Sequence, residues 1–128
     1  MKHDLISDMF TIIRNAEAMG KKECIIPASN LAKAILKIMQ KEKYISDVTF
    51  IEDGKSGLLR IKLSGKINNC GAIRPRFSAS KNEIIKFEKR YLPAANIGIL
   101  IISTPNGVMT HNDAKKKGTG GVLLGYVY

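Results

Sequence analysis

The sequence predicts an α+β protein built from two small modules, residues 1–65 and residues 66–128. In the first module, apolar residues recur at three- and four-residue spacings in two segments and alternate with polar residues in later ones. In the second module strand-like runs predominate, with only short helical segments. Between them, the glycine-bracketed stretch 65–71 marks a seam beyond which acidic residues become scarce. These observations favour an N-terminal αβαββ unit and a mostly β C-terminal module with a short helix.

Residues 4–19 are predicted to form the first helix, because their apolar positions make one continuous stripe. Asp4 is placed to cap the N-terminus of this helix, and Gly20 is a suitable stop. The stripe consists of Leu5, Ile6, Met9, Phe10, Ile12, Ile13 and Ala16.

A short strand at 23–26 follows, and Pro27 ends it. Ser29 is the expected N-cap of a second helix that runs to about Lys41. The next apolar–polar alternation, over 44–63 and interrupted by a glycine-bracketed turn, predicts a β-hairpin. Its apolar positions are Val48, Phe50, Leu59, Ile61 and Leu63.

The second module begins with a predicted strand at 72–80, in which Pro75 favours an edge or irregular position. Residues 82–91 fit a helix or a strand, and the pattern does not decide between them. The clearest buried strand is 97–103. The remaining segments are a short strand at 108–109, helical turns at 110–118 capped by Thr110 and ended by Gly118, and a last strand at 121–128.

Composition excludes several classes of protein. A content of 45% hydrophobic residues is ordinary for a globular chain. No segment approaches the roughly 20 apolar residues that a membrane helix needs, and the charged start of the chain is unlike a signal peptide. His3 and His111 lack partners at metal-ligand spacing, so neither a metal nor a cofactor is expected.

The net charge of +10 is unevenly distributed. Residues 1–64 contain 11 basic and 8 acidic side chains, whereas residues 65–128 contain 10 basic and 3 acidic ones. An excess of positive charge in one half indicates a polyanionic partner. A basic surface that only confers solubility is the simpler alternative, and nucleic acid is favoured over it.

The glycine-rich stretch 118–121 does not fit a nucleotide loop. A phosphate-binding loop leads from a strand into a helix, whereas this stretch leads out of a predicted helix and into a strand. Ser103 has no evident histidine–acid pair, and the second half has only three acids, Glu83, Glu88 and Asp113. The sequence therefore predicts that the protein is not an enzyme.

The same C-terminal residues fit recognition of an RNA backbone. The hydroxyls of Ser103 and Thr104 both donate and accept hydrogen bonds, as a ribose 2′-OH does. Glycines at 107, 120 and 121 let the main chain approach a groove closely. Lysines at 115–117 neutralise phosphates. This combination suits the shallow minor groove of a structured RNA better than base reading in DNA.

Each feature also has a purely structural explanation. Ser103–Gly107 contains ordinary turn formers, the lysines suit the end of a helix, and Gly120–Gly121 would accommodate a bulge. Arg14 and Asn15 fit the polar face of the first helix, and Ser29 fits a helix cap. The candidate RNA-binding residues are Arg14, Asn15, Ser29, Ser103, Thr104, Asn106, Gly107, Lys115, Gly120 and Gly121.

Taken together, these segments resemble the family of small-subunit ribosomal protein eight over nearly the whole chain. The resemblance rests on DLISDMFTIIRNA at 4–16, PASNLAKAILKIM at 27–39, and GILIISTPNGVMTHNDAKKKGTGGVLLGYVY at 98–128. The stretch 70–105 is more similar to the archaeal and eukaryotic branch than to the bacterial one, and an archaeal source is favoured.

The resemblance implies a two-module fold and a structural role in the small ribosomal subunit, in the cytoplasm and without catalysis. It implies direct binding to the central domain of small-subunit rRNA early in assembly, beside neighbouring ribosomal proteins and in a single copy per ribosome. Whether the chain also binds its own mRNA stays open. Ser103, Thr104, Gly107 and the glycine pair 120–121 match the family's RNA-contacting positions.

Two positions depart from the bacterial pattern. Pro105 replaces a third hydroxyl residue in the turn, and Asn30 follows Ser29 where a lysine is frequent. Two other classes of function are alternatives to rRNA binding. One is a protein-interaction module that docks on an acidic protein, and the other is a small hydrolase that uses Ser103.

Overall fold

The computed structural model describes residues 5–52, 54, 57–73, 78–80, 82–94 and 97–128. The chain forms two compact units, Met1–Asn69 and Cys70–Tyr128. Within the described residues, no helix is both long enough and apolar enough to cross a membrane. The predicted cap Asp4 and the predicted edge residue Pro75 lie outside the described residues.

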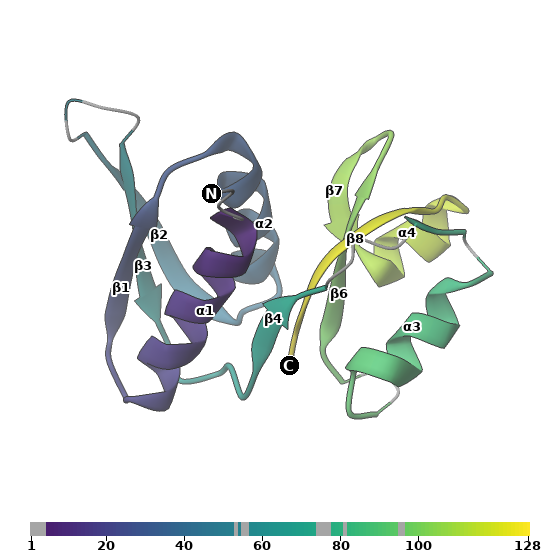
Figure 1. Cartoon of the computed structure of the whole chain (residues 1–128), viewed down its shortest axis with the longest axis horizontal. Coiled ribbons are helices and arrows are strands. Elements are labelled where there is room, and N and C mark those ends of the chain that lie inside the picture. Colours follow the sequence, from purple (N-terminus) through teal and green to yellow (C-terminus); the bar gives the residue numbers. More distant parts are fainter. Residues whose placement is uncertain (1–4, 53, 55–56, 74–77, 81, 95–96) are drawn as a thin grey trace, which may run out of the picture. The chain divides into compact units, whose positions relative to one another are not determined.

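The first unit has the predicted order of helix, strand, helix, strand and strand (Figure 1). Its three strands form one antiparallel sheet in the order β1-β3-β2. The elements are α1 (Leu5–Ala18), β1 (Glu23–Pro27), α2 (Asn30–Lys41), β2 (Ile45–Ile51) and β3 (Leu58–Leu63).

The two helices form because each has one apolar face to bury. Phe10 and Ile13 of α1 and Ile35 and Met39 of α2 are completely buried. On the sheet, Ile61 of β3 is completely buried as well. The free energy gained by removing such side chains from water, about 1.5–3 kcal/mol each, stabilises the unit.

One expected core residue of the hairpin is not buried. Phe50 lies in register with Leu59 and Ile26, which are both buried, yet 46% of Phe50 remains exposed. An edge position alone does not explain this, because Ile26 lies near the end of the other edge strand; Ile26 is instead covered by α1, whose Met9 and Ile12 line a cavity with it. The Lys33 ammonium covers part of the ring, 4.7 Å from its centroid.

The second unit is a five-stranded antiparallel sheet with two helices. Strand β8 pairs with β4, β5 and β6, and β6 also pairs with β7. The elements are β4 (Cys70–Ala72), β5 (Ser78–Ala79), α3 (Ile84–Tyr91), β6 (Ile99–Thr104), β7 (Gly107–Thr110), α4 (His111–Lys117) and β8 (Gly121–Val127).

The second unit departs from the sequence-based expectations at two places and decides a third that the sequence left open. The segment 82–91, which the sequence left undecided, contains the helix α3, because Ile84 and Phe87 on one face enter the core. The single strand expected at 72–80 is instead two short strands, β4 and β5, on either side of undescribed residues. A bulge does occur in β8, but at Leu124 rather than at the glycine pair, because the pairing with β6 skips that residue.

Candidate RNA interface

The hairpin between β6 and β7 contains the turn that the sequence singled out. Thr104 pairs with Gly107, so Pro105 and Asn106 are its two loop residues. Gly107 has a φ of +120°, a conformation that L side chains rarely adopt, which explains the glycine. Asn106 and Gly107 are exposed, whereas Ser103 is half-buried. The tip therefore offers an amide and bare backbone to solvent.

The Thr104 hydroxyl is used by the turn itself. Only 8% of Thr104 is exposed. Its Oγ1 donates a hydrogen bond to the Gly107 carbonyl oxygen at 2.8 Å and accepts one from the Asn106 N–H at 3.2 Å. A hydroxyl has a single hydrogen to donate, so Thr104 has none left for a ligand. Its role visible in the structure is to fix the shape of the hairpin tip.

The glycine pair before β8 is required by packing inside the unit. A Cβ on Gly120 would collide with the carbonyl oxygen of Ala79. A Cβ on Gly121 would collide with the carbonyl oxygen of Ser103 and lie 2.8 Å from Cγ2 of Ile102. The missing side chains therefore let β8 begin between β5 and β6. This contact also brings the glycine pair against Ser103, so two parts of the predicted site lie together.

The short helix α4 leads from the hairpin to the glycine pair. Thr110 caps its start by accepting from the Asp113 N–H at 3.2 Å, and Gly118 ends it with a φ of +66°. Lys115 does not project freely, because its Nζ is paired with Glu88 of α3. The next two lysines, 116 and 117, are exposed. They present more accessible charge than the Lys115 that the sequence prediction chose.

His111 is buried beside the same ion pair. Its Nδ1 accepts a hydrogen bond from the Leu100 N–H at 3.0 Å, so the proton of the neutral ring is on Nε2, which lies 3.5 Å from Glu88 Oε1. Burial lowers the pKa of His111, and the nearby Glu88 carboxylate opposes that shift only in part. Both ring nitrogens are therefore engaged, and neither serves as a base for the Ser103 hydroxyl.

The predicted contacts in the first unit are placed differently. Arg14 and Asn15 are exposed on α1. This exposure fits both an RNA contact and a solvated helix face. Ser29 is the N-cap of α2, and its Oγ accepts from the Ala32 N–H at 3.0 Å. The cap prediction is thus confirmed, whereas a role for Ser29 in binding stays a prediction.

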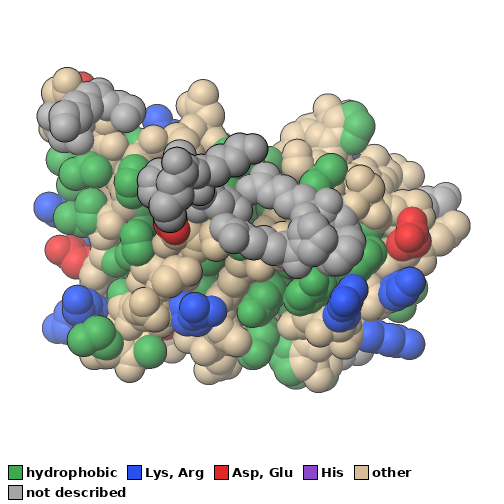
Figure 2. Space-filling view, viewed as in Figure 1, with side chains coloured by type: hydrophobic (Ala, Val, Ile, Leu, Met, Phe, Trp, Pro, Cys, Tyr) green, Lys and Arg blue, Asp and Glu red, His purple; other side chains and the backbone are tan. Residues whose placement is uncertain are grey.

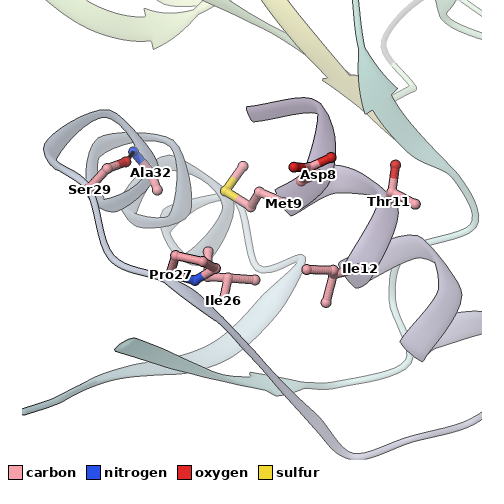
Figure 3. A pocket seen from close by; sticks show the side chains of 8 residues that line it. All are labelled: Asp8, Met9, Thr11, Ile12, Ile26, Pro27, Ser29 and Ala32. Atoms are coloured by element: carbon pink, nitrogen blue, oxygen red, sulfur yellow. Dashed lines mark hydrogen bonds between the residues drawn. The ribbon is translucent and has the colours of Figure 1, made fainter. Parts of the chain in front are cut away.

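Figure 3 shows the surroundings of Ser29, a cavity of about 270 Å³ between α1 and the start of α2. Most of its lining is apolar, and its charged group is the carboxylate of Asp8. An acidic side chain at this place repels a phosphate, which weakens the case for Ser29 as a phosphate ligand. The cavity is lined by Asp8, Met9, Thr11, Ile12, Ile26, Pro27, Ser29 and Ala32.

A second basic surface was missed by the sequence reasoning. It lies on the exposed face of α3 and contains Lys86, Lys89 and Arg90. The three- and four-residue spacing of these cations could have indicated a basic helix face. This spacing is informative only if 82–91 is a helix, which the sequence did not decide. Among the described residues, no group of three His, Cys, Asp or Glu side chains is arranged to hold a metal ion.

The sequence matches the family described as Ribosomal protein S8 over residues 4–128. The chain belongs to the ribosomal protein S8 family. It is also similar to Small ribosomal subunit protein uS8 of Methanococcoides burtonii, with 48% identity over 126 residues, which covers 98% of this chain and 97% of that protein. The predicted resemblance is thereby confirmed, including its archaeal-type branch, since the relative comes from an archaeon.

Membership of the ribosomal protein S8 family makes this chain a structural protein of the small ribosomal subunit that binds rRNA. Its location is the ribosome in the cytoplasm, and its partners are rRNA and other ribosomal proteins. The family is one of structural ribosomal proteins, which fits the expectation that the chain is not an enzyme. The alternative of a separate protein-interaction module is not favoured.

Proposed function

We propose that this ribosomal protein S8 family member binds the central domain of small-subunit rRNA as a single copy early in assembly. In this proposal the β6–β7 hairpin recognises the shape of the RNA. The observation that carries the proposal is the exposed hairpin tip, whose strand lies against the glycine pair that begins β8. Lys117 precedes Gly121 by only four residues, so a positive charge lies close in sequence to the glycine pair.

The chemistry of the tip suits a shallow RNA minor groove. The Ser103 hydroxyl forms no hydrogen bond within the described part of the chain, and Asn106 is exposed. A hydroxyl and an amide each donate and accept, which fits 2′-OH groups and base edges. The exposed lysines 116 and 117 would hold phosphates and make binding depend on salt. Thr104 would act indirectly, by keeping the tip in the binding conformation.

A salt titration of RNA binding tests the proposal. The probe is a transcribed central-domain fragment of small-subunit rRNA, and the control is a plain A-form duplex of equal length. We expect the fragment to bind more tightly at every salt concentration, because shape-reading contacts are less sensitive to salt than phosphate contacts. If both RNAs bind alike and both dissociate as salt rises, net charge alone explains binding and the assignment of the hairpin is wrong.

Variants of Thr104 test the indirect role of its hydroxyl. Thr104→Ala removes both hydrogen bonds that hold the tip, so it should weaken binding to the fragment by about 1 kcal/mol, the scale of one hydrogen bond. Thr104→Ser keeps the hydroxyl and should retain most of the affinity. Equal affinities for the alanine variant and the unmodified chain would show that the conformation of the tip does not govern recognition.

A further inference from the structure

The exposed face of α3 is a concentrated patch of cations. Lys89 and Arg90 follow Lys86 by three and four residues, which places both of them about one turn, or ~5.4 Å, from Lys86 on the same side of the helix. Together with Asn82 and Ile85 they line a shallow depression of about 720 Å³. Every charged side chain that lines this depression is positive.

The two acidic residues of this segment offset only part of the charge of the patch. Glu83 lies at the start of α3, where its Oε1 accepts a hydrogen bond from the Ser80 N–H at 3.2 Å. That bond lowers the pKa of Glu83, and the nearby Lys86 ammonium lowers it further, so Glu83 offsets part of the charge of Lys86. Glu88 is oriented toward α4, where it is paired with Lys115 and approaches His111. Both carboxylates are thus held by other groups of the same unit.

The α3 patch is separate from the hairpin tip. In Figure 1 the β6–β7 hairpin ends at the top of the second unit, whereas α3 lies at the bottom of it. Figure 2 shows several Lys and Arg side chains, in blue, over the part of the molecule where Figure 1 draws α3. An RNA groove held at the tip would therefore not reach the cations of α3.

We propose that α3 is a second RNA-binding surface, which holds the phosphate backbone of an rRNA segment other than the one at the hairpin. The inference rests on the rRNA binding of this protein but does not depend on the hairpin being the recognition element. Lysine and arginine donors would contact phosphates, and the Asn82 amide would contact phosphate or ribose oxygens. Such contacts would join two rRNA segments through one small protein.

The chemistry favours RNA over an acidic protein segment. Ile85, 52% exposed, is the only large apolar side chain that lines the depression. A protein interface needs a fully buried apolar centre with charged groups at its rim, whereas here three of the five lining residues are cations. Phosphate contacts require no apolar centre.

The test compares two doubly substituted full-length chains. One carries Lys86→Gln and Lys89→Gln, and the matched control carries Lys37→Gln and Lys41→Gln. Both pairs are exposed helical lysines one turn apart, so each variant loses two positive charges from a helix face. The probe is the full-length small-subunit rRNA transcript. Affinity is measured over a salt series, and hydroxyl-radical footprinting shows which RNA segments are protected. Thermal unfolding verifies that both variants are folded.

For the α3 variant, the slope of log affinity against log salt should fall by about 1.4–1.8, since each phosphate contact contributes roughly 0.7–0.9. In the footprint, one RNA segment should lose its protection, while the segment protected by the Ser103 hairpin stays protected. The control variant should keep both segments. An unchanged slope and footprint for the α3 variant, or an equal loss in the control, would overturn the proposal.

Two further outcomes keep this proposal distinct from the hairpin proposal. If Ile85→Ala lowers RNA affinity more than the double lysine variant does, the contact is apolar and the backbone assignment is wrong. If the unmodified chain shows no preference for the central-domain fragment but α3 still contributes to the slope, the hairpin proposal fails while the α3 surface stands.

Discussion

At the residue scale, the same side chain types have very different roles in the hairpin and beside it. Thr104 directs its hydroxyl into the turn, whereas the neighbouring Ser103 hydroxyl forms no bond within the described residues. Gly107 is required by backbone conformation, but Gly121 is required by crowding against Ser103 and Ile102. The sequence alone shows two hydroxyl residues and several glycines in this region. Only their neighbours in the folded protein show which of them have a structural role and which are open to a ligand.

A substitution at Gly121 tests the packing explanation. Gly121→Ala should lower the free energy of unfolding by about 1–3 kcal/mol, because the added methyl group overpacks the start of β8. Urea unfolding followed by circular dichroism measures this change. The control is Ser78→Ala, an exposed position on the paired strand β5, expected within about 0.5 kcal/mol of the unmodified chain. Equal stability of the two variants would contradict the crowding.

The buried His111 predicts a dependence of stability on pH. Its pKa is lowered in the folded protein, mainly by burial, so the unfolded chain binds the proton more readily. The contribution to stability is complete above the ordinary histidine pKa and is lost as pH falls through the folded pKa. The free energy of unfolding should change by at most about 1.4 kcal/mol per pH unit when one proton is taken up.

The free energy of unfolding measured from pH 8 to pH 5 checks this expectation. The groups that face His111 are Glu88, Lys115 and Asp113, and all of them remain in the comparison variant His111→Asn. Asparagine retains an acceptor for the Leu100 N–H but does not titrate. The unmodified chain should lose more stability on acidification than the variant, and parallel pH profiles would refute the role of His111.

At the scale of elements, helix α2 shows local sequence and tertiary structure in agreement. Ser29 caps it, its four buried residues lie on one face, and it ends at Lys41 as the pattern predicts. Helix α3 shows the opposite case, because its eight residues contain no side-chain cap and are too short for a decisive apolar period. It is helical because Ile84 and Phe87 reach the core of the second unit.

The cap of α2 can be tested apart from any role in binding. Ser29→Ala should cost about 1 kcal/mol of stability, because the Ala32 N–H loses its acceptor. Ser29→Asp keeps an acceptor at the same place and should remain close to the unmodified chain in thermal unfolding. If the alanine variant unfolds at the same temperature as the other two, the cap makes no net contribution.

At the scale of the whole molecule, two cores and an uneven charge define the chain. The core of the second unit consists of residues of that unit alone, drawn from strands, helices and the segment at Ile73. Most of the excess positive charge also lies in this half of the sequence. We therefore propose that residues 70–128 are a separate folding unit that carries most of the RNA affinity.

The isolated fragment 70–128 provides the test. It should unfold cooperatively on heating, at a lower temperature than the whole chain, since a domain of about 60 residues buries only a modest share of its surface. Its salt slope for the central-domain fragment should stay close to that of the whole chain. A non-cooperative melt would contradict the independence of the unit, and a slope reduced by half would contradict its dominance in binding.

The sequence by itself determined the α+β class, the order of elements in the first unit, the caps Ser29 and Thr110, and the family. The class, the order and the caps depend on local spacing and turn chemistry, which neighbouring residues carry without reference to the rest of the chain. The family follows from the resemblance of the segments 4–16, 27–39 and 98–128 to its members. Only the tertiary structure decided that Thr104 bonds within its turn, that Gly121 meets Ser103, and that Lys115 is paired with Glu88. Each of these depends on atoms that strand pairing or helix packing brings together, and no local pattern encodes which groups will meet.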